Sequence, residues 1–117
     1  MRTLNDYFID GGSLSDIGTA DRASPIVTVP DDGRLNAVAV GIRTAATTAV
    51  VTTFDVFKNS VDTGVDLSIP ASMAVNTGAV GTLDGNVDVV AGDMLHLVTN
   101  GETGNAPTGY FNWVIRR

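Results

Sequence analysis

The sequence contains no cysteine and one histidine, His96, among its 117 residues. Without cysteine there can be no disulfide bond, thiolate metal site or cysteine nucleophile. A zinc site with several histidine ligands, or a pair of histidines acting as acid and base, would need a second chain. Glutamine is absent, and glutamate and lysine occur once each, so good helix formers are scarce. These absences disfavour a helical fold and an ordinary enzyme.

Long apolar runs are also absent. The most apolar stretch, residues 37–42, is far shorter than the roughly 20 residues that span a bilayer. Residues 1–6 do not lead into the apolar region of a secretory signal. We therefore expect a soluble chain that has no membrane partner. The net charge of −6 would repel phosphate backbones, so we expect no nucleic-acid partner either.

The residues that are abundant favour strands. Nearly a third of the chain is Val, Ile or Thr, whose β-branched side chains suit a pleated surface. The 13 Gly and 4 Pro are scattered between apolar segments rather than gathered into a linker. About eight short strands separated by turns predict an all-β protein, a jelly-roll-like antiparallel β-sandwich. From the alternation we expect these residues in the core: Phe54, Val65, Leu67, Ile69, Phe111, Trp113 and Ile115.

The segment 34–44 is apolar on both sides. Strict alternation places Val38, Val40 and Ile42 on one face. It places Leu35, Ala37, Ala39 and Gly41 on the other. Because a strand that is apolar on both faces is buried on both, we expect Ala37 and Ala39 to contact another subunit.

The two ends of the chain supply further interface candidates. Residues 1–23 differ from the rest and predict an extended N-terminal arm, so the β-sandwich domain would cover residues 24–117. The arm could be a loosely ordered terminus, or its apolar cluster could dock on a neighbouring chain. That cluster comprises Leu4, Tyr7, Phe8 and Ile9. At the other end, Arg116 and Arg117 could pair with carboxylates of another chain.

Motifs for chemistry are weak. Residues 84–95 fail the EF-hand pattern because Val89 and Leu95 stand where Gly and Glu are required. Asp84, Asp88 and Asp93 could form a loose cation site, or they could be solvated turn carboxylates. No nucleophile elbow or phosphate-binding loop accompanies His96. We therefore predict no catalytic residue and no cofactor.

Three segments resemble small jelly-roll virion proteins of tailed bacteriophages. Residues 25–35, PIVTVPDDGRL, are similar to the x-V-P-x-x-G-x-(I/L) opening of those proteins. Residues 90–101, VAGDMLHLVTNG, are similar to their V-x-A-G-D-x-(L/I)-x-(L/V)-x-T-x-G segment. Residues 112–117, NWVIRR, resemble their final strand.

The resemblance implies a capsid decoration, or cement, protein. Such a protein would form a homotrimer, bind the major capsid protein and lie on the outer surface of the virion capsid. It would stabilise the contacts between capsomers without an active site. The arm would then reach the shell or the adjacent subunit.

A receptor- or glycan-binding module of a phage fibre is the alternative. It would use Trp113 or Tyr110 as an exposed platform on which a sugar stacks. Trp113 shares its face with Phe111 and Ile115, which favours a place in the core. An enzyme is the third alternative.

Overall fold

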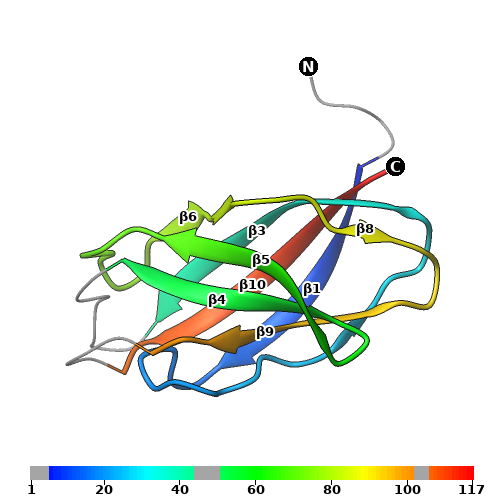
Figure 1. Cartoon of the computed structure of the whole chain (residues 1–117). Coiled ribbons are helices and arrows are strands. Elements are labelled where there is room, and N and C mark those ends of the chain that lie inside the picture. Colours follow the sequence, from blue (N-terminus) through cyan, green and yellow to red (C-terminus); the bar gives the residue numbers. More distant parts are fainter. Residues whose placement is uncertain (1–5, 44–50, 102–105) are drawn as a thin grey trace.

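In the computed structural model, the part of the chain that is described forms ten β-strands in two antiparallel sheets (Figure 1). The structure describes residues 6–43, 51–101 and 106–117, and this part of the chain contains no helix that could cross a membrane. Sheet A has the order β1 (Asp6–Leu14), β10 (Thr108–Arg116), β3 (Gly33–Arg43) and β6 (Gly78–Val80), with β8 (Asp88–Val89) also paired to β3. Sheet B has the order β2 (Val27–Thr28), β9 (Met94–Thr99), β4 (Thr52–Lys58), β5 (Val61–Ile69) and β7 (Thr82–Leu83).

The strand order is that of a jelly roll. When the short β7 and β8 are set aside, four strands remain in each sheet. β1 and β3 belong to sheet A, whereas β2 and β4 belong to sheet B, so the chain changes sheet at each of these connections. The last two long strands, β9 and β10, lie inside sheets B and A. In sheet B, β9 lies between β2 and β4, and in sheet A, β10 lies between β1 and β3. The predicted jelly-roll-like β-sandwich is confirmed.

The core lies between the two sheets and holds the predicted residues. Phe54, Phe111, Trp113 and Ile115 are each at most 1% exposed. The rings of Phe54 and Phe111 meet edge to face across the sandwich, with centroids 5.8 Å apart. Val65, Leu67 and Ile69 are buried from β5. Large buried aromatic and β-branched side chains therefore hold the two sheets together.

A β-bulge corrects the predicted faces of β3. Ile115 pairs with Leu35, but the preceding residue of β10, Val114, pairs with Ala37. Asn36 is the extra residue, and it is exposed. The bulge reverses the alternation, so Leu35 is buried with Val38 in the core and does not share the face of Ala37. The prediction that placed Leu35 on the small-residue face was wrong.

The predicted N-terminal arm is corrected as well. Residues 6–14 form β1, which runs along β10 as an edge strand of sheet A. Tyr7 and Ile9 pack against the core, and Ile17 is fully buried. Residues 6–23 are therefore part of the sandwich, and the predicted boundary at residue 24 is wrong for them. Leu4 lies outside the described residues.

Candidate functional site

The outer face of sheet A carries an apolar patch that we define as Phe8, Ala37, Ala39, Val80 and Val114. Phe8, Val114 and Ala37 form one cross-strand row, and Ala39 pairs with Val80 on the next strand. Phe8 is 57% and Val80 68% exposed, whereas the other three are half-buried. Two predicted interface residues of β3, Ala37 and Ala39, and Phe8 of β1 are thus brought together on one surface.

Charged side chains lie at one end of this face and pair within the chain. Arg116 lies 3.1 Å from Asp6, and Arg34 lies 2.8 Å from Asp88. The Asp6 carboxylate raises the pKa of Arg116. The Arg34–Asp88 pair is exposed on both sides and stabilises the fold by at most about 1 kcal/mol, whereas the Asp6 side chain is 5% exposed. Because these charged side chains pair within the chain, the apolar patch rather than the charged end of the face is the candidate for contact with another protein.

The remaining predicted interface residues contact their own chain. Arg117 lies 2.6 Å from Asp31, and the Tyr7 hydroxyl donates a hydrogen bond to the Asp31 carbonyl oxygen. The Asp32 amide, and then Arg117, lower the pKa of Asp31. Arg116 and Arg117 therefore find carboxylates within the chain, so another chain is not required as their partner. Tyr7 and Ile9 face the core rather than a neighbour.

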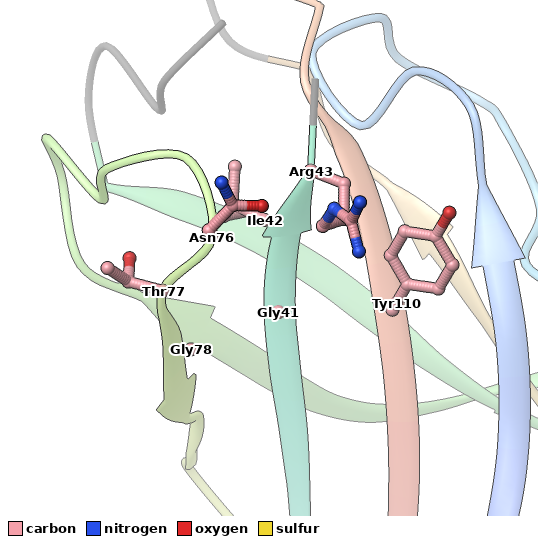
Figure 2. A pocket seen from close by; sticks show the side chains of 7 residues that line it. All are labelled: Gly41, Ile42, Arg43, Asn76, Thr77, Gly78 and Tyr110. Carbon is pink, nitrogen blue, oxygen red and sulfur yellow. The ribbon is translucent and has the colours of Figure 1, made fainter. Parts of the chain in front are cut away.

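A shallow trough lies at the other end of the same face (Figure 2). Its floor is Gly41 of β3, which pairs with Tyr110 on one side and Gly78 on the other. Two adjoining hollows of about 350 and 380 Å³ share these three residues. In Figure 2 the Arg43 guanidinium lies between β3 and the Tyr110 ring, and Asn76 lies on the far side of β3. Tyr110 is 45% exposed.

The three aspartates considered as a cation site each have a different role. Asp84 accepts a hydrogen bond from the Asp66 amide, and Asp88 pairs with Arg34. Asp93 accepts bonds from the Val90 amide and the Asn59 side chain, which lower its pKa. No group of three or more potential metal ligands occurs in the described part of the chain. These residues are turn carboxylates, and the described structure does not bring the three together as one group of ligands.

The outer face of sheet B is polar and acidic. Asp55 and Asp66 are directly opposite on β4 and β5. Partial burial, and then a hydrogen bond and repulsion from Asp55, raise the pKa of Asp66 above its usual value of 3.8. His96 lies on this face with its ring stacked on Phe57 at 5.0 Å, and burial lowers its pKa. The two faces of the sandwich therefore differ: sheet A has an apolar patch, and sheet B has carboxylates.

Replacing Asp66 by asparagine is expected to stabilise the protein at pH 7 but not at pH 3. Because the native pKa is raised, the stability that Asp66 contributes is fully present below 3.8 and is lost as pH rises through the native value. An asparagine side chain cannot ionise and so avoids that loss. Thermal unfolding at the two pH values measures the difference, and Asp55→Asn should act similarly by removing the same repulsion. A lower midpoint for both variants at pH 7 would contradict the assignment.

Comparisons with known proteins support the fold alone. No protein-family model and no curated protein matches the sequence. Among solved structures, the chain is similar to a Paenibacillus sp. cycloisomaltooligosaccharide glucanotransferase complexed with cycloisomaltoheptaose, with a TM-score of 0.57, 14% identity and 95% of this chain covered. It is also similar to an Arthrobacter globiformis T6 isomalto-dextranase complexed with panose, with a TM-score of 0.56, 18% identity and 97% covered. The chain spans only 16% and 23% of those two proteins, so the likeness is to one domain of each.

Sequence reasoning found the apolar patch in part and missed the trough. Ala37 and Ala39 were recognised from alternation, but Val80 comes from a three-residue strand, β6, that pairs with β3 from a distant part of the sequence. Asn76 enters the trough with the same segment. Glycine at position 41, inside a predicted strand, was the available signal.

Proposed function

We propose that the protein is a structural virion component, a capsid decoration protein that binds the outer surface of a phage head as a homotrimer and stabilises capsomer contacts. The observation that carries the proposal is the apolar patch on a rigid sheet face. The resemblance of three segments to jelly-roll virion proteins gives that surface its partners: copies of the chain and the major capsid protein.

The apolar patch suits contact between proteins. Small residues on β3 let another backbone approach closely, and exposed Phe8 and Val80 supply apolar area on either side. Contiguous exposed apolar surface of this kind marks interaction sites. A decoration protein stabilises its shell by mass action, because it binds the assembled state better than the free subunits. That action needs a stiff body and no catalytic group.

The alternative is a receptor- or glycan-binding module of a phage fibre. Of the two residues that it could use as a platform for a sugar, only one is exposed. Trp113 is 0% exposed, so the interpretation that used it as a platform was wrong. Tyr110 is on the outer face and is half-exposed.

Replacing Ala39 by Arg is expected to convert a trimer into monomers. The new charge would lie in the middle of the apolar patch, where burial without a partner is unfavourable. Light scattering at micromolar concentration measures the mass of each variant. Thr28→Arg is the matched control, because Thr28 is exposed on β2 of the other sheet. If Ala39→Arg is still a trimer, the apolar patch is not part of the trimer interface. If the wild type is a monomer, the proposal of a trimer is wrong.

Binding to undecorated phage heads tests the role itself. Wild-type protein and Thr28→Arg should co-sediment with heads that lack the protein, and the decorated heads should resist heating better than bare ones. Ala39→Arg should remain in the supernatant. If the wild type does not bind heads of the phage that encodes it, the decoration role is wrong.

A further inference from the structure

Gly41 has no explanation inside the fold. It lies within β3, and it is not among the residues with positive φ. Among the described residues, a Cβ atom at this position would meet nothing closer than the Thr77 carbonyl oxygen at 4.0 Å. Glycine inside a strand is destabilising, and it often marks a place where a ligand or another backbone approaches closely. No contact among the residues that the structure describes therefore requires a glycine at position 41.

Gly78 extends the same open floor. It pairs with Gly41 across the strands, and a Cβ at Gly78 would be in ordinary contact, 3.4 Å from the Val40 carbonyl oxygen. On the other side of Gly41 lies Tyr110, which in turn pairs with Ser13 of β1. One aromatic residue and two residues without side chains thus lie side by side on the outer face. This arrangement leaves room for a flat group beside the Tyr110 ring.

Polar groups surround this space. Within the described part of the chain, the side chains of Arg43, Asn76 and Asn112 form no hydrogen bond or ion pair, and all three line the trough. The amides offer both donors and acceptors, and the guanidinium offers five donors. No lining residue is acidic, although the chain has 13 acidic residues. Arg43 is therefore the only charged side chain in the trough.

We propose that the trough binds a saccharide, with a preference for sugars that carry a carboxylate. A sugar ring has an apolar C–H face, which the Tyr110 ring covers, and a hydroxyl edge, which the Asn76 and Asn112 amides bind. The Arg43 guanidinium pairs with the carboxylate, and such pairs are stronger than neutral hydrogen bonds.

Other ligands fit the trough less well. Cation sites in proteins usually include carboxylate oxygens, and the lining supplies none. A polyphosphate or nucleic acid would meet one arginine on a chain of net charge −6. This inference does not depend on the decoration role, because the residues proposed to bind the sugar lie outside the apolar patch. The patch shares only the lining residues Ala39 and Val80 with the trough.

Titration calorimetry with a glucuronic acid-containing oligosaccharide tests the proposal. The matched probe is the same oligosaccharide with glucose in place of glucuronic acid. Wild-type protein should bind the acidic probe at least tenfold more tightly than the neutral one. Arg43→Gln should remove this preference. Tyr110→Ala, and Gly41→Val, which fills the floor, should weaken binding of the acidic probe at least tenfold.

Phe8→Ala is the matched control, because it removes an exposed aromatic side chain from the same face but outside the trough. It should leave saccharide binding unchanged. Circular dichroism establishes that each variant is folded. Absence of heat with both probes overturns the proposal, as does equal binding by wild type and Tyr110→Ala. If the wild type binds no saccharide and Tyr110→Ala loses the trimer, the trough is a contact between copies of the chain. That result would also overturn the saccharide proposal.

Discussion

Replacing Trp113 by alanine is expected to lower the free energy of unfolding by about 3–5 kcal/mol. Trp113 is fully buried in the middle of β10, between Ile9 of β1 and Val38 of β3. Its removal leaves a cavity that surrounding side chains from two sheets fill only partly. Since a domain of this kind is stable by roughly 5–15 kcal/mol, the loss is a large fraction of the total. Urea unfolding followed by circular dichroism measures it.

Tyr110→Ala is the control for this prediction. It removes an aromatic side chain from the same strand, but from the opposite face, where Tyr110 is half-exposed. We expect a change of about 0.5 kcal/mol. Trp113→Phe should cost less than Trp113→Ala, because it keeps a ring in the core and removes a buried Nε1–H group that has no partner in the described structure. Equal losses for Trp113→Ala and Tyr110→Ala would contradict the placement of Trp113 in the core.

The fold class and much of the core could be predicted because they follow from local patterns. Alternation over residues 65–69 of β5 and over β10 identifies inward residues correctly, since burial alternates regularly in both segments. The face of Leu35 could not be predicted, because one extra residue, Asn36, reverses the alternation. A bulge depends on how β3 meets β10, and that pairing joins residues some 80 positions apart.

The arm was mispredicted for a related reason. β1 contains Gly11 and Gly12 and is irregular between Asp10 and Ser13, so its sequence does not alternate cleanly. A Cβ at Gly11 would lie 2.7 Å from Nε1 of Trp113. The glycine that made this segment resemble a loop is needed for its close packing against β10. Polar spacing that suggests a flexible terminus can therefore belong to an edge strand.

The three segments that carry the resemblance meet at one corner of the sandwich. The Val29 amide donates to the Asp93 carbonyl oxygen, and the Gly92 amide donates to the Val29 carbonyl oxygen. The Ala91 amide donates to the Asp32 carboxylate, and Arg117 pairs with Asp31. The motif residues are thus explained by the turns they form and by the contacts between those turns. For this reason the motifs indicate the fold more directly than they indicate a function, and only Val114 and Asn112 of the candidate surfaces lie within them.

Gly33, the glycine of the first motif, gives the second large prediction: Gly33→Ala should lower the free energy of unfolding by about 1–3 kcal/mol. A Cβ there would lie 2.6 Å from the Arg116 carbonyl oxygen and 2.8 Å from Cγ2 of Ile115. The first of these atoms is backbone, so β3 and β10 would have to move apart where they pair.

Gly41→Ala in the same strand is the matched control, and it should change stability in the opposite direction. The new methyl group would have no neighbour closer than 4.0 Å, so the variant loses conformational freedom only in the unfolded chain and gains about 0.5–1 kcal/mol. Chemical denaturation of both variants gives the two signs directly. If Gly41→Ala is as destabilising as Gly33→Ala, the fold itself requires Gly41, and its glycine no longer points to an external ligand. If Gly41→Ala is stabilising, the glycine at the floor of the trough weakens the strand. That is expected of a position that serves binding rather than folding.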